Sequence, residues 1–198
     1  MRPQPARAQV AAWVGATGSL SARLARAHPP FSVRVLQQGR APAWPGELDS
    51  LGLPAHAPLL AREVLLCGDG APLVFARSVT SVQAARGAWR AIQGLGTRPL
   101  AQLLFSRSEI RRSPLQWQWL SPVDPQARTI ARAWQVASGQ ALPARGLWLR
   151  HSLFERGGQS LRVAECFLPR LVANWPAAGA AGQKGTTSVG YFQKSRNR

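Results

Sequence analysis

The carboxylates of this chain are few enough to weigh one by one as candidate acids, bases or ligands. They are Glu47, Asp49, Glu63, Asp69, Glu109, Asp124, Glu155 and Glu165. Glu47 and Asp49 are expected in a loop, and Glu63 is expected on the solvent side or at the edge of a strand. Glu165 differs, because the residues around it in 162–168 are those of a buried strand. Burial would shift its pKa, as acids and bases in catalysis require, so Glu165 is the candidate acid or base.

Two arginines are placed side by side by a predicted β-hairpin. Asp69-Gly70 lies between two apolar, β-prone runs, which is the strongest short-range signal for a hairpin. A turn centred on this pair sets Arg62 opposite Arg77, and like charges in that arrangement destabilise a sheet unless an anion lies between them. A carboxylate suits such a pair. The alternatives are that one arginine turns outward into water, or that a longer loop shifts the register by one residue and separates them.

A second hairpin is predicted between residues 146 and 168. With Gly157-Gly158 at the centre of its turn, Arg150 faces Glu165, and this pair is complementary in charge. One interpretation is an ordinary cross-strand ion pair worth a fraction of a kcal/mol, which we favour for Arg150. The other is that Glu165 faces a pocket.

The remaining reactive side chains show no spacing typical of metal binding or nucleophilic catalysis. His28, His56 and His151 share no metal-ligand spacing with one another or with the cysteines. The sequence also lacks a P-loop and a G-x-S-x-G elbow. Cys67 and Cys166 lie in apolar runs outside any C-x-x-C motif, as expected for reduced core residues of a cytoplasmic protein. We therefore expect a pocket with no metal and no cofactor.

Composition favours a single domain and gives weak support to nucleic-acid binding. The chain has 198 residues, a formal net charge of +17 and a pI near 12.0. Its arginines are scattered singly, and no zinc-finger, homeodomain or RNA-recognition motif is present, so we expect no specific nucleic-acid partner. No apolar run is long enough to span a membrane.

Capping signals and hydrophobic periodicity outline the elements of the chain. Helices are expected over 19–28, 82–95, 99–105 and 125–136, and a strand is expected over 31–36. The proline-rich segment 40–58 is expected to be an extended connection. We expect a helical extension over 1–18 and a disordered tail over 170–198.

Four motifs in order resemble the chorismate pyruvate-lyase family over roughly residues 19–169. They are Leu60-Ala61-Arg62-Glu63-Val64-Leu65-Leu66-Cys67, Leu95-Gly96-Thr97-Arg98-Pro99-Leu100 followed by Leu104-Phe105, Leu147-Trp148-Leu149-Arg150-His151-Ser152, and Glu165-Cys166-Phe167-Leu168-Pro169. The resemblance implies an α+β fold in a single domain, with an antiparallel sheet flanked by helices and a pocket that closes over its ligand. Residues 113–146 are interpreted as an insertion, because relatives are shorter there.

The resemblance also implies roles for particular residues. Arg62 would hold the ring carboxylate of the ligand, Leu100 would contribute to the pocket, and Glu165 would lie at the other end of the ligand. Arg77 matches a second arginine of the family, and Leu20 stands where relatives have a methionine in the pocket. On this interpretation Glu165 and Arg77 are the catalytic residues, and Arg62, Leu100, Glu165 and Leu20 bind substrate or product.

The implied activity is conversion of chorismate into 4-hydroxybenzoate and pyruvate for ubiquinone biosynthesis. We expect a cytoplasmic monomer that uses no cofactor. The alternative is a non-catalytic module that senses aromatic acids, since the same fold resembles effector-binding domains of bacterial transcription regulators. Such regulators carry a separate DNA-binding domain, for which the N-terminal segment here has no room, so the enzyme is favoured.

Overall fold

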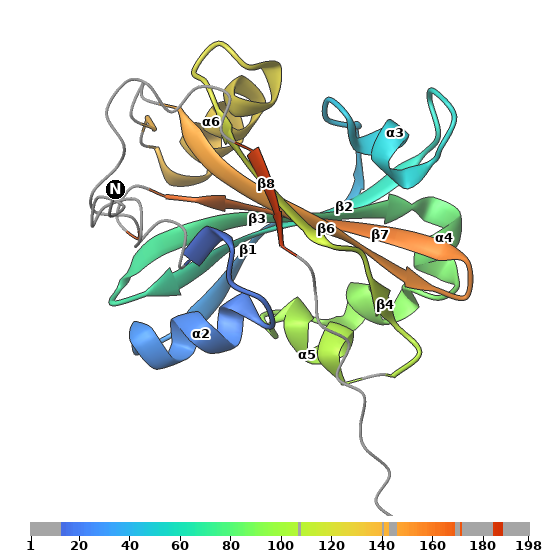
Figure 1. The fold of residues 1–198 in the computed structure, drawn as a ribbon, viewed down its shortest axis with the longest axis horizontal. Coiled ribbons are helices and arrows are strands. Elements are labelled where there is room, and N and C mark those ends of the chain that lie inside the picture. The colour runs from blue at the N-terminus through green and yellow to red at the C-terminus, as the bar shows by residue number, and fades with distance from the viewer. Residues whose placement is uncertain are drawn as a thin grey trace, which may run out of the picture.

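An eight-stranded antiparallel sheet forms the centre of the protein (Figure 1). This computed structural model describes residues 13–106, 108–139, 141–142, 146–168, 171 and 184–187. The strand order is β1-β2-β3-β7-β6-β5-β8, and β4 pairs with β6 beside this path. The strands are β1 Ser32–Ala41, β2 Leu59–Gly68, β3 Ala71–Ser81, β4 Arg111–Arg112, β5 Leu115–Leu120, β6 Leu147–Arg156, β7 Gln159–Phe167 and β8 Lys184–Thr187.

Helices cover both faces of this sheet. They are α2 Leu20–Ala27, α3 Glu47–Leu51, α4 Val82–Arg86, the 3-10 helix η1 Arg90–Gly94, α5 Leu100–Phe105 and α6 Pro125–Ser138. Figure 1 shows α2 and α5 on one side of the sheet and α3 and α6 on the other. The predicted α+β class, an antiparallel sheet flanked by helices, is therefore confirmed.

The predicted helix starts coincide with side-chain caps. The Ser19 hydroxyl accepts a hydrogen bond from the Ala22 amide at 3.1 Å, which satisfies a free N–H in the first turn of α2. The Asp124 carboxylate accepts one from the Gln126 amide at 2.7 Å, and Pro125 occupies the first turn of α6. The helices predicted over 19–28 and 125–136 are both present.

Three predicted segments differ from the structure. The single helix expected over 82–95 is divided into α4 and η1, because the chain turns at Gly87 and the Trp89 indole donates to the Gln159 carbonyl at 3.0 Å. The connection expected over 40–58 contains α3. The segment interpreted as an insertion supplies β5, which lies between β6 and β8 inside the sheet, as well as α6.

The β2–β3 hairpin has the predicted turn but not the predicted register. Asp69 and Gly70 both have positive φ, as a two-residue hairpin turn requires, and Gly68 pairs with Ala71. A β-bulge follows, so that Cys67 pairs with Pro72 whereas Leu66 pairs with Val74. Proline cannot donate to the ladder and is tolerated in strands at such irregularities.

The bulge places one extra residue on β3 and moves every later pair by one position. Glu63 therefore faces Arg77, and Arg62 faces Ser78. The predicted facing of Arg62 and Arg77 is wrong, and the two arginines lie on opposite faces of the sheet. The β6–β7 hairpin, in contrast, has the predicted register throughout, including Arg150 opposite Glu165.

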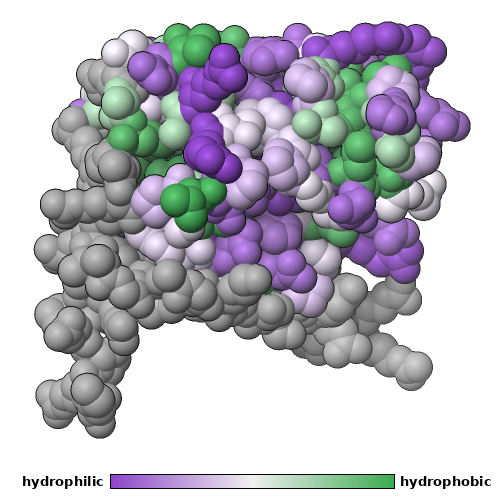
Figure 2. Space-filling view, turned by 90° about the horizontal axis from the view of Figure 1, so that it is seen from above, coloured by the Kyte–Doolittle hydropathy of each residue, from purple (hydrophilic) through white to green (hydrophobic). Residues whose placement is uncertain are grey.

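Apolar side chains pack against both faces of the sheet. On one face, Leu24 of α2 packs with Val64 and Trp148, and on the other, Ile130 and Trp134 of α6 pack with other sheet residues. Seen from above, the face in Figure 2 carries mostly hydrophilic residues with separate hydrophobic groups between them. None of the helices in the described part of the chain has the length and apolar character needed to cross a bilayer.

The ends of the chain are described only in part. In the segment expected as a tail, β8 pairs with β5, and Leu171 is the only other described residue. Of the expected extension over 1–18, residues 1–12 lie outside the described residues.

Candidate active site

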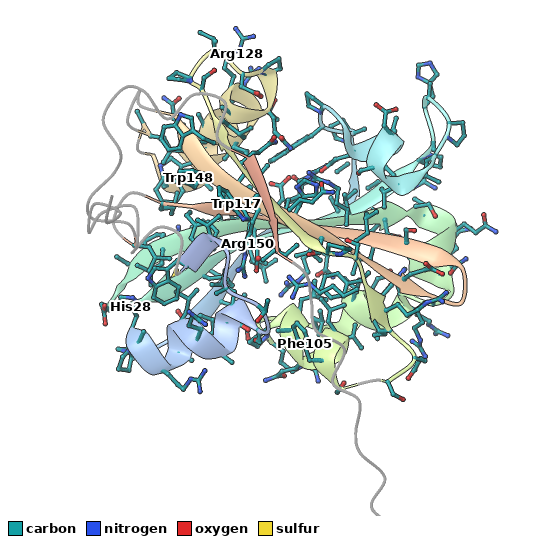
Figure 3. All side chains as sticks on the ribbon, viewed as in Figure 1. His28, Phe105, Trp117, Arg128, Trp148 and Arg150 are labelled. Carbon is teal, nitrogen blue, oxygen red and sulfur yellow. The ribbon has the colours of Figure 1, made fainter. Side chains whose placement is uncertain are left out.

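A cavity lies between the sheet and the helices α2 and α5. Its charged lining residues are Arg62, Arg112, Arg150 and Glu165, and its apolar lining includes Leu20 and Leu100. Figure 3 shows Arg150 near the middle of the sheet and Phe105 on α5, and both residues line this cavity. The structure thus brings together Leu20, Arg62, Leu100 and Glu165, for which the family resemblance implied a role, whereas Arg77 is not among the residues of this cavity.

Arg62 is held by the loop that precedes α5. Its Nη2 donates to the carbonyl of Gly96 at 2.8 Å and to that of Arg98 at 3.2 Å. The side chain is 2% exposed, and its Nε is buried without a hydrogen-bond partner among the described residues. Burial lowers the pKa of Arg62, but a guanidinium stays protonated in proteins. Arg62 therefore presents a buried, charged donor that an anion can satisfy.

Buried Arg150 and partly buried Glu165 form an ion pair in the same cavity. Arg150 Nε donates to Glu165 Oε2 at 2.6 Å. Arg150 Nη1 donates to the carbonyls of Trp13 at 3.2 Å and Ala16 at 2.8 Å. Because Arg150 is fully buried and both residues line the cavity, the two interpretations weighed for Glu165 hold together: it is paired, and it faces a pocket.

Arg112 is a cavity residue that the sequence reasoning missed. Its Nε donates to the Ser152 hydroxyl at 3.1 Å, and its Nη1 is buried without a partner in the described part of the chain. Its Cζ lies 5.2 Å from the ring centre of Phe154 and 5.8 Å from that of Phe105. Burial lowers the pKa of Arg112, and the charge of Glu165 opposes that shift. Arg112 lies in a short strand with no turn or cap signal, so only proximity to the Leu104-Phe105 motif could have suggested it.

Arg77 lies on the opposite face of the sheet, in a buried cluster with two carboxylates. Its Nε donates to Glu47 at 2.7 Å, its Nη2 donates to Glu47 at 2.9 Å, and its Nη1 donates to Glu63. The Arg77 guanidinium also lies 4.2 Å from the ring centre of Trp44. Glu47 and Glu63 are both buried, so their expected places in a loop and toward solvent are wrong. Each of the three guanidinium nitrogens of Arg77 donates to one of these carboxylates, and Nη2 also donates to the Pro42 carbonyl. Arg77 is therefore not part of the substrate site that we propose.

His151 is expected to make the stability of the protein depend on pH. It follows Arg150 on β6 and so points to the opposite face, where its Nδ1 is buried without a partner among the described residues. Burial and the charge of Arg162 lower its pKa from 6.5 to about 4. Below pH 6.5 the His151 side chain binds a proton in the unfolded chain but not in the folded chain. The free energy of unfolding should therefore fall as the pH is lowered from 6.5 to about 4.

Urea unfolding at several pH values between 7 and 4 checks this expectation, because His151→Asn removes the titrating ring. The variant should lose less stability over this interval than the unaltered protein. An identical loss in both proteins would show that His151 does not carry the effect.

Comparison with solved structures first defines the fold class. PhnF from Mycobacterium smegmatis superposes with a TM-score of 0.51 at 14% identity, covering 78% of this chain and 65% of that one. A GntR-family transcriptional regulator from Bacillus cereus gives a TM-score of 0.50 at 8% identity, covering 71% of this chain and 92% of that one. At these identities the likeness shows a shared fold.

Comparison of sequences then defines the family. The family model for chorismate lyase matches residues 4–175, which include the segment interpreted as an insertion. A probable chorismate pyruvate-lyase of Albidiferax ferrireducens is 50% identical over 155 residues, which is 78% of this chain and 79% of that protein. A probable chorismate pyruvate-lyase of Azoarcus sp. is 41% identical over 171 residues, which is 86% of this chain and 89% of that protein. The chain belongs to the chorismate lyase family.

Proposed function

We propose that this chain converts chorismate into 4-hydroxybenzoate and pyruvate, as the reaction that supplies the ring for ubiquinone biosynthesis. The observation that carries the proposal is the buried, unsatisfied Nε of Arg62 in a cavity that also holds the carboxylate of Glu165. An aromatic acid with a hydroxyl group has a partner for each of these two groups. Membership of the chorismate lyase family supports the same substrate.

The reaction is an elimination that makes the ring aromatic. The bond between ring carbon C3 and the ether oxygen breaks, and C4 loses its hydrogen as a proton while keeping its hydroxyl group. The leaving enolpyruvate takes a proton on its methylene carbon and becomes pyruvate. The reaction passes no electrons to or from a second molecule, so it needs no redox cofactor. The protein contributes orientation of the substrate and stabilisation of charge.

We assign Arg62 to the ring carboxylate and Glu165 to the 4-hydroxyl side of the ring. The carbonyls of Gly96 and Arg98 fix the guanidinium of Arg62, so it needs little reorganisation to bind an anion. Arg150 holds Oε2 of Glu165, and no other described side chain donates to this carboxylate. Glu165 is therefore oriented and able to assist the movement of the C4 proton. Leu20 of α2 and Leu100 of α5 supply apolar walls of the cavity.

We further propose that the protein acts as a cytoplasmic monomer. The two cysteines, Cys67 and Cys166, are both free, as in proteins of reducing compartments. The charged lining residues of the cavity lie on four strands of the same sheet, β2, β4, β6 and β7, which supports a site built within a single copy.

The first test is incubation of the purified protein with chorismate, without added metal, while 4-hydroxybenzoate and pyruvate are both measured. We expect the two products in equal amounts. Arg62→Ala should lower the rate at sub-saturating chorismate by roughly 30-fold or more, because removing one member of a buried charge pair costs about 2 kcal/mol or more. Arg34→Ala, an exposed arginine on the neighbouring strand, is the matched control and should keep the rate.

Two outcomes would redirect the proposal. If no products form while 4-hydroxybenzoate binds stoichiometrically, the chain is a sensing module on the same fold. If Arg34→Ala loses activity as Arg62→Ala does, the loss reflects a general change of charge and not the cavity.

A further inference from the structure

We propose that Arg112 binds the second carboxylate of the substrate, the one on the enolpyruvyl group. The inference rests on the proposed function, because it names a partner for the part of chorismate that the product 4-hydroxybenzoate lacks. The predicted hairpin had set Arg77 beside Arg62 as a partner for a carboxylate, and the β-bulge puts Arg77 on the other face of the sheet. The second carboxylate therefore needs another cation.

The charges of the cavity match those of a dianion. Its charged lining residues are Arg62, Arg112, Arg150 and Glu165, which together carry two net positive charges. Chorismate carries two carboxylates, so the occupied cavity is neutral. A buried net charge of either sign would be costly, and this balance is what a site for a dianion requires.

Hydrogen bonds already present leave two of these arginines with a free buried donor. The Nε and Nη1 groups of Arg150 are used by Glu165 and by the carbonyls of Trp13 and Ala16. Arg62 Nε and Arg112 Nη1, in contrast, are buried and have no partner among the described residues. Leaving such a donor of a charged group unsatisfied is costly, so each is explained if a ligand oxygen accepts from it.

The two free donors reach the cavity from separate strands on the same face of the sheet. Arg62 lies on β2, and Arg112 is bonded to Ser152 on β6, with β3 and β7 between these strands. Three strand spacings separate β2 from β6, which is roughly 14 Å before the long side chains turn inward. Glu165 lies on β7, within this interval. A ligand held by Arg62 at its ring carboxylate and by Glu165 at its 4-hydroxyl side has its C3 substituent free to extend toward Arg112.

Arg112 is also fixed in the orientation that such a contact needs. Ser152 accepts from its Nε, and the guanidinium lies over the rings of Phe105 and Phe154. A planar guanidinium held in this way loses little side-chain entropy on binding. As the C3–O bond breaks, negative charge grows on the leaving enolpyruvate, and a cation already beside its carboxylate stabilises that charge.

Comparison of substrate with product gives a direct test. Arg112→Gln should lower kcat/KM for chorismate by about 30-fold or more, because it removes the partner of a buried carboxylate. The Kd for 4-hydroxybenzoate should change by no more than about threefold, since this product has only the ring carboxylate. Retained product affinity also shows that the pocket of the variant is folded.

Arg111→Gln is the matched control, because Arg111 is the preceding residue on the same strand and its exposed side chain pairs with Glu155. It should leave both constants unchanged within about threefold. Ser152→Ala, which removes the group that orients Arg112, should lower kcat/KM with little change in the Kd for 4-hydroxybenzoate.

Three results would overturn the inference while leaving the proposed function intact, provided that the unaltered protein makes both products. The first is an unchanged kcat/KM in Arg112→Gln. The second is an equal loss for chorismate and 4-hydroxybenzoate, which would place Arg112 at the ring carboxylate or in a structural role. The third is an equal loss in Arg111→Gln. Failure of the unaltered protein to convert chorismate would instead refute the proposed function itself.

Discussion

Glu47→Ala is expected to lower the free energy of unfolding by about 3–5 kcal/mol. Glu47 is 0% exposed, and its two carboxylate oxygens accept from Arg77 Nε and Nη2. Among the residues that the structure describes, the substitution leaves the buried Arg77 guanidinium with Glu63 as its only carboxylate partner. Removing one member of a buried ion pair is costly because the remaining charge stays out of water without compensation.

The measurement is urea unfolding of the variant beside Asp49→Ala, which makes a comparable truncation two residues further along α3. Asp49 is exposed, so its variant should stay within about 0.5 kcal/mol of the unaltered protein. A similar loss in both variants would mean that the stability of α3 matters and the buried pair does not. A negligible loss in Glu47→Ala would mean that water reaches Arg77 readily.

Glu165→Gln is expected to lower kcat by roughly 100- to 1,000-fold, the usual range for loss of a positioned acid or base. Glutamine keeps the shape of the side chain and an oxygen that can accept from Arg150 Nε. It cannot exchange a proton at neutral pH, so the loss should fall on turnover. The Kd for 4-hydroxybenzoate should change by less than about tenfold, since Arg62 still binds the carboxylate.

Steady-state kinetics and product titration of Glu165→Gln separate these two effects. Glu155→Gln provides the matched control, because Glu155 is a partly exposed carboxylate on the neighbouring strand β6 that pairs with Arg111. It should keep both constants. An unchanged kcat in Glu165→Gln would remove this residue from the chemistry, and a loss confined to binding would make it a ligand contact only.

Features with a local cause could be predicted from the sequence. Ser19 and Asp124 start helices because their side chains cap the free amides of the next few residues. Gly157-Gly158 sets the β6–β7 register because both glycines accept the positive φ values of a tight turn. Arg150 therefore faces Glu165 as the turn alone requires.

Features that depend on residues far away in the sequence could not be predicted from it. The β2–β3 register depends on a bulge beside Pro72, and the turn residues Asp69 and Gly70 do not indicate this bulge. The burial of Glu47 depends on Arg77, which lies 30 positions further along the chain. The family resemblance indicated four residues that the structure gathers in one cavity, Leu20, Arg62, Leu100 and Glu165, but it did not indicate Arg112.

The two hydrogen bonds from Arg150 to the carbonyls of Trp13 and Ala16 bear on how the protein is best prepared. They connect the beginning of the described chain to the same guanidinium that orients Glu165. Removing the residues before Gly18 would remove the two carbonyl acceptors of the buried Arg150 guanidinium. It would not alter any side chain that contacts the proposed substrate. Affinity tags and protease sites at this end should therefore leave Trp13 and the residues after it intact. Activity is then measured with the Glu165 carboxylate in its native orientation.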